Sequence, residues 1–277
     1  MKIKFWGCRG SIPVADNRMM KYGGNTTCLE VWLDDRLLII DAGTGIRLLG
    51  EQLVKNNVKN IDVFITHSHW DHIMGFPFFM PIYNKDVKIR IFGCTSSYKK
   101  LQDIFAGQMS YEYFPVSFSD LKSEIQFQET CGDKYRINNH TIKTIQTNHP
   151  IYTTGIRIEK GNKSFVFITD NELNLEKPKT KPEKFIEFCS DADYLIHDAQ
   201  FTDMEYPKHT GWGHSTFEQV IALAKESNAK NAGFYHHGPD RKDIELDGLL
   251  MKYSHYCTDN NCNFTVFAVK EMQEIEL

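Results

Sequence analysis

The 277-residue sequence lacks the segments that insert a chain into a membrane or direct it out of the cell. No apolar run approaches the length of a membrane span. The chain begins Met1-Lys2-Ile3-Lys4-Phe5-Trp6, which is typical of a strand and unlike the basic and apolar regions of a secretory signal. We therefore expect a cytoplasmic protein without a membrane partner.

The cysteines do not form the pattern of a disulfide framework or a zinc knuckle. Seven cysteines are scattered along the chain, and the number is odd. Without a secretory signal, they are expected to be reduced thiols. Cys257 and Cys262 are near neighbours, but no second pair accompanies them, so both are interpreted as unpaired packing thiols.

An excess of positive charge is also missing. The formal net charge is −4, which argues against a broad electrostatic grip on polyanions. There is no fixed-period repeat and no low-complexity segment. With 41% apolar residues, the chain can bury one sizeable core. We predict a single domain over residues 1–277.

β-rich blocks alternate with helices along the chain. Strands are predicted at residues 2–6, 28–33, 37–40, 61–65, 89–92, 135–137, 141–147, 155–159, 164–169, 194–196, 232–235 and 264–269. Helices are predicted at residues 46–55, 97–108 and 242–256, and another runs through residue 227 after a capping box at 215–218. Residues 176–184 are predicted to be a solvated loop, and the aromatic segment 109–121 to be a lid or a packing surface. Two packed sheets with helices outside would satisfy this pattern.

A dense group of metal-binding residues follows the apolar strand at residues 61–65. His67, His69, Asp71 and His72 all lie within six residues. Alternate residues of a strand share a face, so His67 and His69 can converge on one point. A turn after His69 would direct Asp71 and His72 to a second point nearby. A structural role would have to account for all four residues at once, so we interpret them as metal ligands.

Further candidate ligands stand where later strands end. His149 follows the strand at 141–147, and Asp170 follows the strand at 164–169. His236 and His237 follow the strand at 232–235. Strand ends that open into loops are where such folds carry chemistry, and a catalytic metal needs nitrogen and oxygen donors with one open position.

The pattern H-x-H-x-D-H, followed by His149, Asp170 and His236, resembles the metallo-β-lactamase superfamily over nearly the whole chain. This resemblance implies an α/β fold, the four-layer αββα sandwich, and a hydrolase with two divalent metal ions. Zinc is the expected metal, with manganese or iron as alternatives. The implied ligands are His67, His69 and His149 for one metal, Asp71, His72 and His236 for the other, and Asp170 between them. His237 is the alternative to His236.

Branches of this superfamily differ at two of these positions. β-Lactamases usually lack a ligand like His72 and have a cysteine where Asp170 stands. The di-iron redox branch usually has a glutamate where His69 stands. The sequence therefore resembles the glyoxalase and phosphodiesterase branches.

A second motif resembles ribonuclease Z. Residues 195–200, Leu-Ile-His-Asp-Ala-Gln, resemble its H-E-A-T box, and Gly213-His214-Ser215-Thr216 resembles its second histidine motif. The resemblance implies that Asp198 orients His214, which serves the phosphate and the leaving group. A carboxylate can fix the tautomer of an imidazole, and a helix N-terminus favours an anion. The alternative is that His214 only forms part of the turn before the helix.

Ribonuclease Z carries a long tRNA-binding arm between the positions of His149 and Asp170. Here residues 150–169 read as one hairpin, so tRNA is not expected as a partner. The stretches 7–13 and 22–26 resemble small bacterial proteins of this branch, some of which hydrolyse cyclic nucleotides. Arg9 in this region could contact a phosphate or belong to a structural loop.

The leading hypothesis is a phosphodiesterase for a small substrate such as a 3′,5′-cyclic nucleotide, with catalytic Asp71, His214 and Asp198. Asp71 would ligate a metal and hydrogen-bond the attacking hydroxide. The alternatives are a ribonuclease, a glyoxalase II-like thioesterase, a di-iron redox protein and a non-catalytic binding module. A homodimer is the assembly that we consider.

Overall fold

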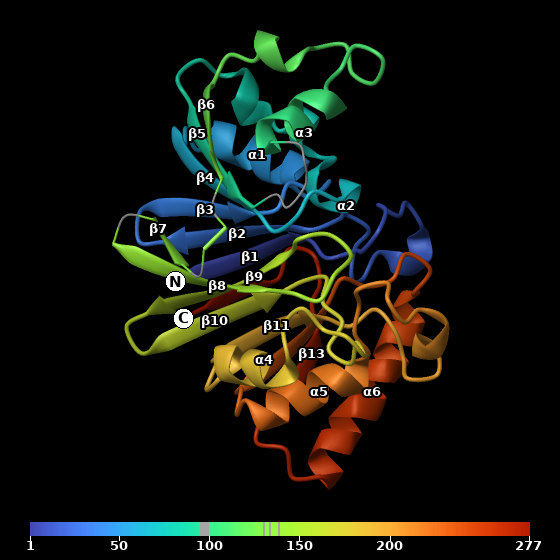
Figure 1. The fold of residues 1–277 in the computed structure, drawn as a ribbon. Coiled ribbons are helices and arrows are strands. Elements are labelled where there is room, and N and C mark those ends of the chain that lie inside the picture. The colour runs from blue at the N-terminus through green and yellow to red at the C-terminus, as the bar shows by residue number, and fades with distance from the viewer. Residues whose placement is uncertain (95–99, 130, 133, 138) are drawn as a thin grey trace.

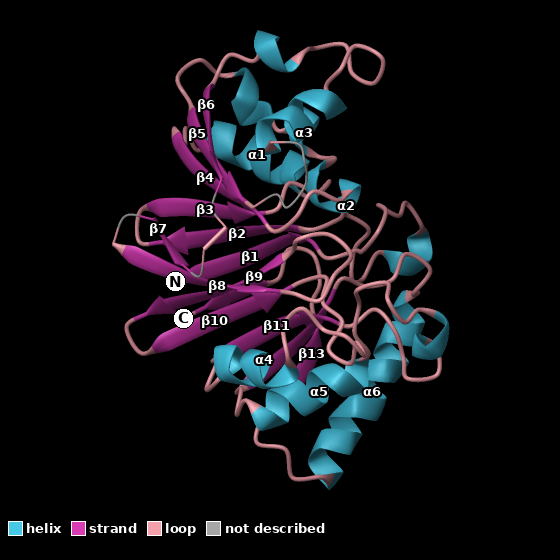
Figure 2. Cartoon of the chain, viewed as in Figure 1, coloured by secondary structure: helices cyan, strands magenta, loops and turns pink. Residues whose placement is uncertain are grey.

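Two large sheets face each other in the computed structural model, which describes residues 1–277 except 95–99, 130, 133 and 138. Among the described residues, each sheet has seven strands. Helices α1–α3 cover the outer face of one sheet and α4–α6 that of the other, as Figures 1 and 2 show. The predicted α/β class and αββα layering are confirmed. The assignment of residues 1–277 to one domain stays a prediction.

The first sheet has the strand order β14-β1-β2-β3-β4-β5-β6. Its strands are β1 (Lys2–Gly7), β2 (Cys28–Leu33), β3 (Arg36–Ile40), β4 (Asn60–Ile65), β5 (Lys88–Gly93), β6 (Glu124–Glu129) and β14 (Glu274–Glu276). The helices on this side are α1 (Ile46–Lys55), α2 (Trp70–Ile73) and α3 (Leu101–Gln108).

The second sheet has the order β13-β12-β11-β10-β9-β8-β7. Its strands are β7 (Lys134–Ile137), β8 (His140–Gln146), β9 (Thr154–Lys160), β10 (Lys163–Ile168), β11 (Tyr194–Asp198), β12 (Asn231–Tyr235) and β13 (Thr265–Ala268). The helices on this side are α4 (Pro182–Cys189), α5 (Phe217–Glu226) and α6 (Asp243–Asp259).

The hydrophobic core lies in three layers that match this architecture. Side chains such as Phe5, Phe64 and Phe165 pack between the two sheets. Separate apolar clusters lie under the helices on each outer face. Each sheet is thus buried on both faces, which explains the near-continuous apolar runs of its central strands.

Strand direction determines where the site can form. Strands β3 to β6 run parallel in the first sheet, and β10 to β13 run parallel in the second. The carboxyl ends of parallel strands meet at one edge, where ligand sites of such sheets form. The loops from both sheets gather on the right-hand side of the molecule in Figure 2.

Several local predictions need correction. Strands β6 and β14 were not predicted, because they are largely exposed edge strands with only two apolar residues in β6 and one in β14. The predicted solvated loop at 176–184 is wrong at its end, since α4 already begins at Pro182. The capping box of α5 lies one residue later than predicted, since Thr216 is the N-cap and Gln219 its partner, where Ser215 and Glu218 were expected. Part of the helix predicted at 97–108, and the turn residue Asn138, lie outside the described residues.

The prediction that all cysteines are reduced thiols is also wrong. Cys94 and Cys131 form a disulfide between the end of β5 and the segment after β6. Their pairing depends on the tertiary contact of these strands, which the scattered spacing did not reveal. Cys257 and Cys262 are free thiols, as predicted.

Candidate metal centre

Four strand ends deliver the predicted ligands to one place. His67 follows β4, His149 follows β8, Asp170 follows β10 and His236 follows β12. His69 is the N-cap of the short helix α2, whose first turn carries Asp71 and His72 inward from the same loop. All of these side chains are buried except that of His69, which is half-buried.

The first group consists of the imidazoles of His67, His69 and His149 and the carboxylate of Asp170. His69 Nδ1 lies 3.1 Å from His67 Nε2 and 3.0 Å from His149 Nε2. Donor atoms about 2.0–2.1 Å from a zinc ion in tetrahedral geometry stand about 3.3 Å apart. The spacing of these nitrogens is close to that of ligands around a common ion.

The second group contains Asp71, His72 and His236, whose donor atoms all lie within 4.8 Å of one another. Asp71 Oδ2 lies 3.1 Å from His236 Nε2 and 3.4 Å from His72 Nε2. His72 Nε2 is buried and makes no hydrogen bond, although carboxylate oxygens surround it. This geometry suits a ring nitrogen that faces an ion.

Asp170 stands between the two groups and offers one oxygen to each. Its Oδ2 lies 3.6 Å from His67 Nε2 and 3.8 Å from His149 Nε2. Its Oδ1 lies 3.2 Å from His72 Nε2 and 3.4 Å from His236 Nε2. This is the arrangement of a carboxylate that bridges two ions.

Hydrogen bonds behind the histidines select the ring nitrogens that face the centre. His72 Nδ1 donates to Asp41 Oδ2 at 2.7 Å, and His149 Nδ1 donates to the carbonyl of Gly213 at 3.1 Å. His236 Nδ1 donates to Gln200 Oε1 at 3.2 Å. In the neutral ring each bond keeps the proton on Nδ1, so that Nε2 is the nitrogen available as a ligand, as expected of a metal-bound histidine.

Asp41, Gln200 and Gly213 were not predicted in these supporting roles. Asp41 follows the apolar strand β3, so the strand-end pattern that singled out Asp170 could have found it. Gln200 lies two residues beyond Asp198, and only the folded loop brings it behind His236. At Gly213, where φ is 87°, an added Cβ would stand 2.2 Å from His149 Nδ1. Only glycine can therefore support His149 there.

The electrostatics of the two groups differ. Burial lowers the pKa of His149 to about 4, and burial also lowers the pKa values of His67 and His69. These rings are therefore neutral and can bind a cation. Burial opposes a charge on His72 and His236, but Asp71 and Asp170 raise both pKa values above the ordinary range. The carboxylates thus favour positive charge at this point, which a divalent ion would supply.

Three residues of the site have left-handed backbone conformations although none is glycine. The φ angles are 63° at Asp41, 53° at Asp170 and 56° at His236. Such conformations cost about 1–3 kcal/mol and persist where the surrounding structure imposes them. Here the strained residues stand one or two positions after β3, β10 and β12, where they turn side chains into the centre.

The alternative ligand His237 points elsewhere. Its Nε2 donates to the carbonyl of Val269 at 2.7 Å, and its ring is fully buried away from the two groups. His236, in contrast, contacts both Asp71 and Asp170. The geometry therefore favours His236 over His237 as the last ligand.

Asp198 and His214 lie beside the metal groups as a hydrogen-bonded pair. His214 Nδ1 donates to Asp198 Oδ2 at 2.7 Å, and Asp198 is fully buried at the end of β11. His214 lines the cavity over the centre, and its Nδ1 lies 4.0 Å from Asp170 Oδ2. With Nδ1 engaged, Nε2 is the nitrogen that remains for a substrate.

The N-terminal loop reaches the centre through Ser11 and not through Arg9. The Ser11 N–H donates to Asp71 Oδ2 at 2.8 Å. Arg9 is fully buried and donates to the backbone carbonyls of Gly23, Gly238 and Arg241. The interpretation of Arg9 as a phosphate contact is therefore wrong, and its alternative as part of a structural loop holds. Its guanidinium satisfies carbonyls that would otherwise be buried without donors.

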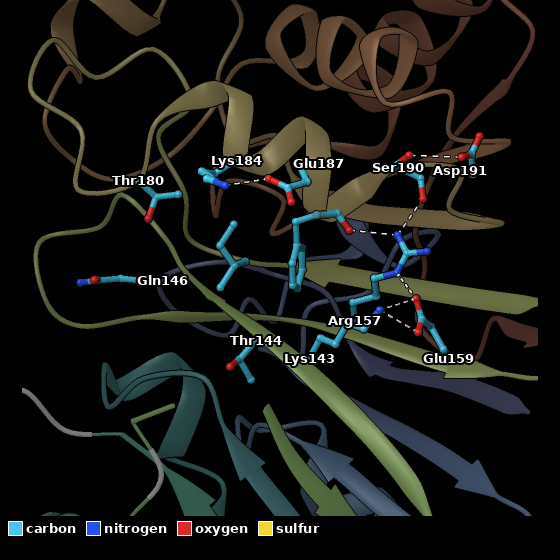
Figure 3. Close-up of a pocket in the computed structure, with 12 residues that line it drawn as sticks. Lys143, Thr144, Gln146, Arg157, Glu159, Thr180, Lys184, Glu187, Ser190 and Asp191 are labelled. Atoms are coloured by element: carbon cyan, nitrogen blue, oxygen red, sulfur yellow. Dashed lines mark hydrogen bonds and ion pairs between the residues drawn. The ribbon is translucent and has the colours of Figure 1, made fainter. Parts of the chain in front are cut away.

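A cavity of about 450 Å³ opens over the metal groups. It is lined by Ser11, Ser68 and Trp70 and by five residues of the site, which are His69, Asp71, Asp170, His214 and His236. A larger cavity, about 880 Å³, lies instead against β8, β9 and α4 (Figure 3). Its cations are engaged there, since Arg157 and Lys143 pair with Glu159 and Lys184 pairs with Glu187. Among the described residues, no group with metal-ligand spacing lines it.

The aromatic segment 109–121 packs on the first sheet. Phe114, Phe118 and Leu121 are partly buried against the cluster under α1 and α3, while Tyr111 and Tyr113 are exposed. None of these residues lines the cavity over the metal groups. The packing interpretation of this segment therefore fits better than a lid over the site.

The sequence matches a protein family described as "Anti-Pycsar protein Apyc1" over residues 14–255. It is also similar to ribonuclease Z of Thermoplasma acidophilum, with 25% identity over 89% of each chain. This relative gives no support to the expectation that tRNA is not a partner. Among the described residues, no helix is long and apolar enough to cross a membrane.

Two solved structures share the whole fold. The metallo-beta-lactamase fold protein YhfI from Bacillus subtilis has a TM-score of 0.71 at 18% identity and covers 100% of this chain and 99% of its own. The short form of human tRNase Z has a TM-score of 0.68 at 18% identity, with the same coverage. Both similarities establish the fold.

Proposed function

The chain belongs to the Anti-Pycsar protein Apyc1 family and is a metal-dependent hydrolase of the metallo-β-lactamase superfamily, and on this premise we propose that it cleaves phosphodiester bonds with two metal ions. The observation that carries this proposal is the pair formed by His214 and Asp198 beside the ligand groups. His214 also lies within metal-ligand spacing of Asp170 and His236, but we assign its imidazole to the substrate because the other seven residues already form two ligand groups.

His67, His69 and His149 would hold one ion, Asp71, His72 and His236 the other, and Asp170 would bridge them. The donor spacing and the hydrogen bonds behind the rings support this assignment. When bound, two such ions lower the pKa of water to generate a nucleophile and neutralise charge on the phosphoryl oxygens. We propose zinc, because imidazole and carboxylate ligands suit it.

The protein's own groups would act on both sides of the phosphorus. Water forms the new P–O bond, the ester P–O bond breaks, and the leaving oxygen takes up a proton. His214 Nε2 can hydrogen-bond a phosphoryl oxygen, or deliver this proton when the ring is charged. The buried Asp198 carboxylate then balances the charge and fixes the ring, as in other acid–base pairs. Asp71, which Ser11 holds from behind, would orient the attacking water.

A small phosphodiester, such as a 3′,5′-cyclic nucleotide, is the substrate that we propose first. The segment between His149 and Asp170 forms only the hairpin of β9 and β10, and no arm extends from it. The cavity over the centre, about 450 Å³, lies in the size range of small-molecule sites.

RNA is the second candidate substrate. It is favoured by the relatives named ribonuclease Z, one of which aligns with the whole chain at 23% identity. A single-stranded or structured RNA would present the same phosphodiester to the same groups. The two candidates differ in what surrounds the scissile phosphate and not in the reaction.

A substrate panel tests the proposal with metal-loaded protein. We expect hydrolysis of bis(p-nitrophenyl) phosphate and of cyclic nucleotides, with slower cleavage of pre-tRNA and of S-lactoylglutathione. The Asp170→Ala variant, purified in parallel, controls for contaminating enzymes. Far faster turnover of the thioester would contradict phosphodiester chemistry, and preferential cleavage of pre-tRNA would favour the second candidate.

A further inference from the structure

A second cavity of about 570 Å³ lies next to the metal centre. Ser11 lines both cavities, so they are neighbours. Gln200, which supports His236, also lines the second cavity. A molecule whose phosphate occupies the metal centre could therefore extend into it.

Three aromatic side chains form one side of this second cavity. Phe201 and His209 stack with ring centroids 4.2 Å apart, and the Trp212 ring stands edge-on to His209 at 4.8 Å. His209 Nδ1 donates to the carbonyl of Glu205, which fixes the middle ring. Trp212 remains 58% exposed, so its ring offers a large apolar surface beside the cavity.

The loop that presents Trp212 is held by a buried carboxylate. Glu172 accepts hydrogen bonds from the N–H groups of Gly211 and Gly213, which flank Trp212, and from the Tyr206 hydroxyl. Both glycines have φ of 87°, a conformation that favours glycine. Trp212 is thus held exposed by specific contacts, since a loop without them could fold its ring onto the surface.

The charges in this cavity argue against a second phosphate. Glu205, Asp240 and Glu245 contribute carboxylates to the lining, and Arg241 is its cation. Arg241 is already paired with Glu205, at 2.5 Å. A strand of RNA would bring further phosphates to this region, where the acidic lining would repel them. A neutral, flat group with N–H donors fits both the rings and the carboxylates.

We propose that this cavity is a nucleobase subsite in which the base stacks against Trp212. The inference rests on the proposed function, because it assumes that the nucleotide's phosphate lies in the metal centre. Stacking tolerates different bases, whereas the carboxylates favour bases that carry amino groups. Trp212 would therefore set affinity for the nucleoside part, apart from the chemistry at phosphorus.

The test compares Trp212→Ala and Trp212→Phe with the parent protein on two substrates. One is a 3′,5′-cyclic nucleotide with an amino-bearing base, and the other is the matching cyclic ribose phosphate methyl glycoside, which has no base. We expect Trp212→Ala to raise KM for the nucleotide about tenfold, since one stacked base contributes roughly that factor or more. The rise in KM should be at least about fivefold larger for the nucleotide than for the base-free ester. Trp212→Phe should have a KM close to that of the parent.

Tyr256→Ala, which removes a half-exposed ring outside both cavities, is the matched control and should match the parent on both substrates. Equal losses on the two substrates, or no loss with Trp212→Ala, would overturn the subsite. If neither ester is hydrolysed, the proposed function fails instead. The subsite is then judged by calorimetric binding of the 5′-nucleoside monophosphate, which must weaken in Trp212→Ala.

Discussion

Nδ1 of His214 donates a hydrogen bond to Oδ2 of Asp198 over 2.7 Å, which joins the end of β11 to the residues that precede α5. Asp198 Oδ1 also accepts from the N–H of Ser215 at 3.3 Å. The carboxylate therefore holds both the imidazole and the backbone beside it. This is the geometry of an orienting pair, and it makes His214 a group whose removal can be separated from metal binding.

We expect His214→Ala to lower kcat on a phosphodiester by about 10²–10³-fold, because one proton-donating or charge-stabilising group is lost. Asp198→Asn should act through the same ring, so the double variant should be about as slow as the slower single one. Steady-state kinetics and metal analysis check this together, and both ions should remain bound.

Asp193→Asn is the matched control for Asp198→Asn. Asp193 is also a buried carboxylate, but it precedes β11 and holds Ser164 and Lys230. We expect it to lower stability and leave turnover of the folded protein near that of the parent. Losses that multiply in the double variant, or metal lost with His214→Ala, would place His214 among the ligands.

Elemental analysis of purified protein should find close to two transition-metal ions per chain, because seven donors in two groups share one carboxylate. His67→Ala should lose ions and activity, and Asp170→Ala should lose both most completely, since its oxygens face both groups. His140→Ala should keep both ions, because His140 pairs with Asp34 outside the centre. Full activity after removal of all metal by a chelator would refute the two-metal reaction.

Asp41→Asn should weaken metal binding about 10–100-fold although Asp41 does not face the ions. The Asp41 carboxylate accepts a hydrogen bond from His72 Nδ1. In Asp41→Asn the side-chain NH₂ group can occupy the position of this oxygen, and His72 Nδ1 then has no acceptor. Competition with a chromophoric chelator measures the affinity. Asp62→Asn, which removes a buried carboxylate paired with Arg36 and Arg90, should change stability and not affinity. Equal affinities of Asp41→Asn and the parent would leave Asp41 as a purely structural residue.

The metal-free protein should show a pH dependence that comes from His149. Its pKa falls from 6.5 to about 4 on folding, mainly because it is buried. As pH falls, His149 therefore takes up a proton in the unfolded chain before it does so in the folded protein. Its contribution to the free energy of unfolding is complete above about pH 6.5 and is lost progressively towards pH 4. Urea unfolding in the presence of a chelator measures this. As pH falls from about 6.5 to about 4, the free energy of unfolding of the parent should decrease more than that of His149→Gln. A stability difference that is constant or grows in favour of the parent would contradict this.

The local sequence was enough to identify most of the ligand groups. His67, His69, Asp71 and His72 are close in the chain, and the apolar strand before them already determines which residues can converge. Asp170, His149 and His236 could be found because each ends a buried strand, and a strand end at a sheet edge is where a polar side chain can face a site. The capping box of α5 was found to within one residue, since it depends only on neighbouring positions.

Long-range contacts decided what the sequence left open. His236 and His237 are adjacent and chemically identical, and only the left-handed backbone at His236 turns one ring to Asp71 while Val269 takes the other. Arg9 reads equally well as a phosphate ligand or a structural residue, and its fate depends on carbonyls more than 200 positions away, in Gly238 and Arg241. Cys94 and Cys131 pair because β5 and β6 are neighbours. The sequence by itself determined which residue types stand at the strand ends. The packing of the two sheets determined which of their atoms meet, because local spacing does not encode distances between strands that are far apart in the chain.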